Sequence, residues 1–149
     1  MDAPLIAREL REHGRVVVTP NGSSMWPLLR DGRDSVSLSR LHGMPRRGDV
    51  VLFVRENGDC VLHRVIAVKG EQCEFQGDGQ RQVELVERGQ ILARMDALWR
   101  GAKQVRLSGL GYRLYVALWC GPVGRLLRPL LLRADRALWK RMHKQKGAT

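Results

Sequence analysis

Three side chains that could together transfer an acyl group follow one another along the sequence: Ser24, His63 and Asp78. A serine hydroxyl attacks an amide when a neighbouring base accepts its proton and when hydrogen-bond donors stabilise the oxyanion. In this set Ser24 would attack, His63 would shuttle the proton and Asp78 would hold the imidazole ring. The order of the three residues is compatible with this chemistry, and their spacing alone does not prove it.

Each of the three residues also has an ordinary structural interpretation. The stretch Gly22-Ser23-Ser24 is typical of a surface loop, and Gly77-Asp78-Gly79 of an Asx-turn. His63 lies in an apolar run, which favours a neutral imidazole that can accept a proton, but a core histidine bonded to a carbonyl group fits the same setting. Both interpretations stay open when the residues are considered one at a time.

The cysteines indicate neither a disulfide framework nor a metal site. Cys60, Cys73 and Cys120 are odd in number and irregularly spaced, which favours a reducing compartment. Cys60, His63 and Cys73 could be imagined as zinc ligands, but Cys-x-x-Cys pairs and a fourth ligand are missing. We therefore expect no metal and no cofactor.

The elements that must position the candidate residues are mostly short strands. Asp2 can cap a short helix that stops at Gly14. Glycine-rich turns then separate runs with strand patterns, and this alternation predicts a mainly β, compact antiparallel fold. The runs are residues 15–19, 36–38, 50–54, 61–68, 73–76, 82–86 and 91–95. We expect a β-domain with its N-terminal helix over residues 1–100 and a helical appendage over residues 101–149.

The net positive charge lies in the last third of the chain. Residues 1–99 hold 14 basic and 14 acidic side chains, whereas residues 100–149 hold 12 basic side chains and the single acid Asp135. Apolar residues recur at helical spacing from Val123 to Met142, with basic residues between them. This basic amphipathic helix, with Trp119 and Trp139, could lie on an anionic membrane, pack on the β-domain or a second copy, or bind a partner protein.

Nothing in the sequence predicts a secretion signal or a transmembrane segment. Charged residues interrupt the first turns, and the longest uncharged apolar run, between Arg113 and Arg125, is shorter than a bilayer requires. We expect a cytoplasmic protein that could associate peripherally with the membrane.

Four sequence boxes together resemble the type I signal peptidase family and its relatives. They are Gly22-Ser23-Ser24-Met25-Trp26-Pro27, Gly48-Asp49-Val50-Val51-Leu52-Phe53, His63-Arg64-Val65-Ile66 and Gly77-Asp78. Their order and approximate spacing match over residues 16–95. The resemblance implies a signal-peptidase/LexA-like β-fold and a hydrolase that performs proteolysis.

The same resemblance implies roles for individual residues. Bacterial housekeeping members carry a lysine base where this chain has His63, so the chain resembles the branch that uses a Ser-His dyad with a helping Asp. Ser24 would be the nucleophile, His63 the general base and acid, and Asp78 the orienting carboxylate. Met25 would line the site, and the backbone N–H of Ser24, with Ser23, would serve the oxyanion, because Gly22 stands where many members carry a hydroxyl.

The sequence thus predicts a serine endopeptidase that cleaves leader-like, signal-like or other peptides through an acyl-enzyme. A catalytically silent module that binds a peptide, a partner or an anionic surface is the alternative. Nucleic-acid binding lacks a recognition motif, and the short segment before Val16 leaves no room for the DNA-binding domain of a LexA-type repressor. The oligomeric state is not indicated.

Overall fold

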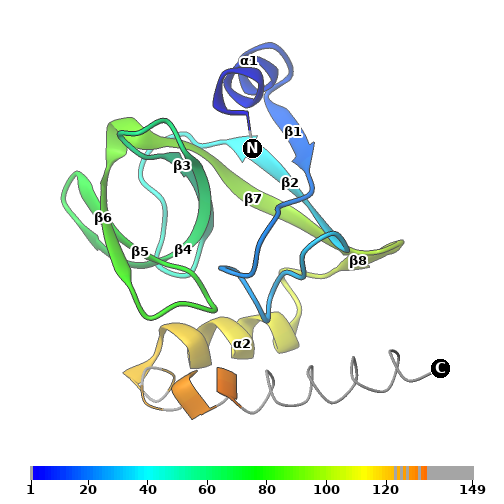
Figure 1. Ribbon diagram of the computed structural model, residues 1–149, viewed down its shortest axis with the longest axis vertical. Coiled ribbons are helices and arrows are strands. Elements are labelled where there is room, and N and C mark those ends of the chain that lie inside the picture. Colours follow the sequence, from blue (N-terminus) through cyan, green and yellow to red (C-terminus); the bar gives the residue numbers. More distant parts are fainter. Residues whose placement is uncertain (1, 123, 125, 127, 131, 134–149) are drawn as a thin grey trace.

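An antiparallel β-sheet dominates the computed structural model, which describes residues 2–122, 124, 126, 128–130, 132 and 133 (Figure 1). Within these residues the sheet has eight strands, and its main path runs in the order β1-β2-β7-β3-β4-β5-β6, while β8 pairs with β7. The mainly β, antiparallel prediction is confirmed. The strands are β1 (Arg15–Val18), β2 (Asp34–Arg40), β3 (Val50–Val54), β4 (Cys60–Lys69), β5 (Gln72–Gln76), β6 (Val83–Glu87), β7 (Ile91–Arg100) and β8 (Lys103–Val105).

The N-terminal helix α1 (Ala3–His13) begins and ends where the sequence predicts. The Asp2 side chain accepts a hydrogen bond from the backbone N–H of Leu5 at 3.2 Å, which satisfies one free donor of the first turn. Gly14 ends the helix in the left-handed conformation, with φ of 70°. Ile6 and Leu10 are buried, so this helix anchors the start of the chain on the sheet.

Strand β7 joins the two halves of the sheet, because it pairs with both β2 and β3. Strands β3, β4, β5 and β6 curve around one side of the molecule, and β7 runs across from them to β2 and β8 (Figure 1). Register shifts occur in the β2–β7, β3–β7 and β4–β5 pairs. Such irregularities bend strands, which allows this curvature.

The core lies on both faces of β3, as its continuous apolar run predicts. Val50 and Leu52 belong to a cluster shared with α1 and the segment after β1, whereas Val51 and Phe53 belong to a second cluster inside the curved part. The second cluster also contains Val65, Cys73, Phe75 and Val86. This inner face of the sheet carries the candidate histidine.

Helix α2 (Leu110–Cys120) and a 3-10 helix η1 (Arg88–Gln90) complete the described elements. The predicted boundary between residues 100 and 101 falls inside the β7–β8 hairpin, and α2 lies against the end of the sheet (Figure 1). Beyond α2, Arg128 donates hydrogen bonds to the Trp119 carbonyl oxygen at 2.8 Å and to Gln76 Oε1. The described part of the predicted appendage is therefore packed on the β-domain.

No helix in the described part of the chain is both long and apolar enough to cross a membrane. Most of the amphipathic helix predicted from Val123 to Met142 lies outside the described residues, as does Trp139.

Candidate active site

The turn that carries Ser24 lies directly on the turn that carries Asp78. The backbone N–H of Gly79 donates to the Ser24 carbonyl oxygen at 2.8 Å. A Cβ atom at Gly77 would lie 2.5 Å from that same oxygen, and one at Gly79 would lie 2.7 Å from the carbonyl oxygen of Ser23. Only glycine permits this approach, so the two glycines bring the serine turn into its place.

His63 lies next to this contact. It is a buried residue of β4, paired with Val51 of β3, and the edge of its ring faces Phe53 with the ring centroids 6.0 Å apart. Its Nε2 atom faces Gly77, where an added Cβ would be 3.1 Å away. A single methyl group at Gly77 would therefore contact both the Ser24 carbonyl oxygen and the Nε2 atom of His63.

The opposite ring nitrogen of His63 faces a carboxylate that the sequence analysis did not single out. Glu84 Oε1 lies 3.0 Å from His63 Nδ1, although the N–H direction is not aligned well enough for a hydrogen bond. Arg55 holds that carboxylate from its other side, with Nε 2.6 Å from Oε2 and Nη2 2.8 Å from Oε1. Arg55, Glu84 and His63 thus form a continuous row of charged and polar groups.

Burial and this row of groups together shift the pKa values of His63 and Glu84. Burial lowers the pKa of His63, the Glu84 carboxylate raises it and Arg55 lowers it, with a net decrease. The hydrogen bonds from Arg55 lower the pKa of Glu84. At neutral pH the imidazole is therefore neutral beside an ionised carboxylate, which is the state that can accept a proton.

Asp78 has different partners from those the sequence predicts for it. Its carboxylate accepts hydrogen bonds from Arg64 Nε at 2.8 Å and Nη2 at 2.6 Å, and a further one from the Tyr115 hydroxyl at 2.8 Å. Arg64 and Asp78 are both fully buried. The geometry gives Asp78 the role of counter-ion to a buried arginine, whereas the carboxylate beside the His63 ring belongs to Glu84.

Helix α2 covers this ion pair. Besides Tyr115, it supplies Trp119, whose Nε1 donates to the Asp78 carbonyl oxygen at 2.9 Å. The rings of Tyr115 and Trp119 stack with their centroids 4.8 Å apart, and the Arg64 guanidinium lies 5.5 Å from the Tyr115 centroid. Trp119, for which the sequence leaves membrane contact, packing on the β-domain and partner binding open, is thus packed inward on the β-domain in the described structure.

The three residues predicted to line the site or serve the oxyanion have different surroundings. The side chain of Met25 is buried in the core cluster with Leu28 and Leu29, so it does not form an open wall of the site. The Ser23 carbonyl oxygen accepts the backbone N–H of Trp26 at 3.2 Å, which tightens the turn. The backbone N–H of Ser24 donates to no described residue.

The described residues form no hydrogen bond between Ser24 Oγ and His63. Ser24 is half-buried, and its turn reaches the histidine through Gly77. Catalytic hydrogen bonds are often long or misaligned before substrate binds and tighten in the complex. Acyl transfer would require Ser24 Oγ to come within hydrogen-bond distance of His63 Nε2.

The cysteines do not gather into a metal site. Cys60, Cys73 and Cys120 are all free thiols. In the described part of the chain, the one group of three potential ligand atoms lies on the surface of α1, at Glu9, Glu12 and His13. Cys60, His63 and Cys73 do not form such a group, so the zinc interpretation gains no geometric support.

The sequence predicted no site role for Glu84, Arg55, Arg64 or Tyr115, and for Glu84 the reason is visible in the sheet. In Val83-Glu84-Leu85-Val86 the apolar residues Val83 and Leu85 are exposed, while Glu84 lies on the same face as its buried partner Phe75. Arg64 could have been recognised from the sequence, because an arginine inside an apolar strand needs a buried counter-ion.

The comparisons with known proteins add no family assignment. No protein-family model matches the chain. No curated protein matches it either.

Proposed function

We propose that this protein is a serine endopeptidase, similar to signal peptidases, that cleaves a peptide bond through an acyl-enzyme on Ser24. The observation that supports the proposal most directly is the contact of the serine turn with Gly77, whose other side faces His63 Nε2. This contact brings the backbone of the serine turn and a buried imidazole, which are far apart in the sequence, to the same glycine.

The proposed reaction uses each group at a stated atom. His63 Nε2 takes the proton of the Ser24 hydroxyl while Oγ bonds to the carbonyl carbon, and the Ser24 N–H stabilises the oxyanion. His63 then gives its proton to the leaving amine as the C–N bond breaks. Water, activated by the same nitrogen, hydrolyses the ester and restores the serine.

Glu84, rather than Asp78, is the orienting carboxylate in this proposal. A carboxylate at Nδ1 favours the tautomer with the proton on that nitrogen, which leaves Nε2 as the acceptor. Asp78 contributes indirectly, because it fixes Arg64 and α2 beside the turn on which Ser24 rests. The substrate class is leader-like, signal-like or other peptides.

A catalytically silent binding module is the second candidate. It is favoured by one observation, the missing hydrogen bond between Ser24 Oγ and His63 among the described residues. In that case the serine turn would be a structural contact for the Gly77–Gly79 turn, and the surface beside it would bind a peptide or a partner without cleaving it.

Cleavage of a peptide library separates the two candidates. The wild type should cleave, whereas Ser24→Ala and His63→Ala should lose nearly all cleavage. Ser108→Ala and His42→Ala are matched controls, because both residues are exposed on the described surface, and they should retain wild-type rates. Equal cleavage by the wild type, Ser24→Ala and His63→Ala would exclude the dyad, and no cleavage by the folded wild type would favour the silent module.

A further inference from the structure

Helix α2 turns its aromatic residues inward and three leucines outward. Leu110, Leu114 and Leu118 are spaced four residues apart and lie on one side of the helix. Their exposures are 72%, 61% and 37%, and we call them the leucine face. Leu126 and Leu130, beyond the helix, are also exposed. An exposed row of large apolar side chains on a helix indicates a contact surface.

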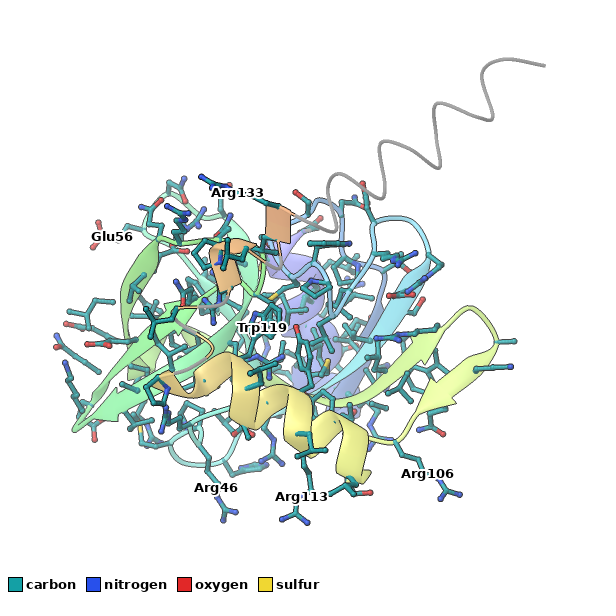
Figure 2. The ribbon with its side chains drawn as sticks, turned by 90° about the horizontal axis from the view of Figure 1, so that it is seen from below. Arg46, Glu56, Arg106, Arg113, Trp119 and Arg133 are labelled. Atoms are coloured by element: carbon teal, nitrogen blue, oxygen red, sulfur yellow. The ribbon has the colours of Figure 1, made fainter. Side chains whose placement is uncertain are left out.

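Exposed basic residues lie along one side of α2. Arg46, Arg106 and Arg113 are exposed, and Figure 2 shows all three projecting along the same edge of the molecule, beside α2. The sequence has no acidic residue between Asp96 and Asp135. The charged side chains that α2 and its flanking residues contribute are therefore all basic, and an apolar surface with a cationic border complements the acyl and headgroup layers of an anionic bilayer.

We propose that the leucine face and its bordering arginines form a docking surface for anionic lipid membranes. The leucines enter the boundary between headgroups and acyl chains, and Arg106 and Arg113 contact the lipid phosphates. The inner side of the same helix holds the Asp78 carboxylate and carbonyl through Tyr115 and Trp119. Docking would therefore bring the serine turn close to the membrane surface. Binding to lipid does not depend on Ser24 being a nucleophile.

Vesicle sedimentation tests the surface. The full-length protein is mixed with vesicles of phosphatidylcholine alone or of an equimolar mixture with phosphatidylglycerol. We expect sedimentation with the mixed vesicles, falling as salt is added, and much less with phosphatidylcholine alone. The double variant Leu110→Gln/Leu114→Gln should bind the mixed vesicles at least about tenfold more weakly. The reason is that polar side chains would replace two exposed leucines, whose transfer from water into the bilayer is favourable.

Two further variants separate this surface from a general effect of charge. Leu5→Gln removes an exposed leucine of α1 and should bind like the wild type. Arg106→Gln/Arg113→Gln should weaken binding by roughly tenfold or more, since each basic residue near an anionic surface contributes several-fold.

Three results would overturn the proposal. One is no sedimentation with the mixed vesicles, and another is equal sedimentation of the wild type and Leu110→Gln/Leu114→Gln. The third is a dimer in analytical ultracentrifugation without lipid that this double variant abolishes, since a second copy would then cover the leucine face.

Discussion

Oε1 of Glu84 lies 3.0 Å from Nδ1 of His63, and this contact joins strand β6 to strand β4 across the inner face of the sheet. Phe75 of β5 pairs with Val65 of β4 on one side and with Glu84 of β6 on the other. Val65, Phe75 and Glu84 therefore lie side by side across the three strands. The relationship makes Glu84 the carboxylate best placed to act on the histidine. The candidate site therefore contains three side chains in successive contact, Arg55, Glu84 and His63, and each contact can be tested by substitution.

The first prediction concerns the Glu84 carboxylate. Glu84→Gln should lower kcat by at least about tenfold, because loss of the orienting carboxylate in a triad can cost up to ~10⁴-fold. Steady-state kinetics on a cleaved library peptide would measure the loss, with Glu87→Gln on the exposed side of the same strand as the control. An unchanged kcat in Glu84→Gln would remove this residue from the site.

The second prediction uses the opposite effects of Arg55 and Glu84 on the histidine. Because the pKa of His63 is lowered from 6.5, activity should fall on acidification only below that pH. Arg55→Gln removes a cation that lowers the pKa of His63, so the acid limb should move to higher pH. Glu84→Gln removes an anion that raises this pKa, so the limb should move to lower pH.

Profiles of kcat/KM against pH would measure these shifts, since that parameter reports the free enzyme. Shifts of both variants in the same direction, or no shift in either, would contradict a row of groups that acts through His63.

The burial of neutral His63 also affects the stability of the fold. Since the unfolded chain binds its proton at higher pH than the folded one, stability should decrease as pH falls below about 6.5.

The third prediction separates stability from catalysis at Asp78. Asp78→Ala leaves the buried Arg64 without its counter-ion and should lower the free energy of unfolding by roughly 3–5 kcal/mol. Tyr115→Phe removes one hydrogen bond to the same carboxylate and should cost about 1–3 kcal/mol. Urea unfolding measures both. A stable Asp78→Ala variant that has lost its activity would instead return Asp78 to the catalytic role implied by the resemblance.

The fourth prediction tests the contact that brings serine and histidine together. Gly77→Ala places a methyl group 2.5 Å from the Ser24 carbonyl oxygen and 3.1 Å from His63 Nε2, so the serine turn must move away. A displacement of about 1 Å can cost on the order of 10²-fold in rate. Gly89→Ala, whose Cβ would meet no atom within 4 Å, is the matched control. Wild-type activity in Gly77→Ala would show that this contact does not position the serine.

The sequence predicts the described strands well where glycine turns bound an apolar run, as at Val50–Val54. It underestimates β7, and it misses β8, because the short segment Lys103–Val105 is polar and is held only by pairing with β7. The resemblance implies that Ser24 lies near His63, but spacing alone could not predict that the serine turn packs on Gly77 and Gly79, because this is a contact between two turns. Glu84 could not be assigned, because the inward face of its strand is decided by pairing with Phe75 and not by its own alternation.

The central claim is that Ser24 is a nucleophile activated by His63, and an acyl adduct tests it without knowledge of the substrate. The protein is incubated with an activated acyl ester, quenched in acid and mapped by mass spectrometry. We expect an acyl group on Ser24 in the wild type, its loss in Ser24→Ala, and a rate of formation at least about 10²-fold lower in His63→Ala. A folded wild type that is not acylated at Ser24, or an adduct that forms equally fast in His63→Ala, would contradict it.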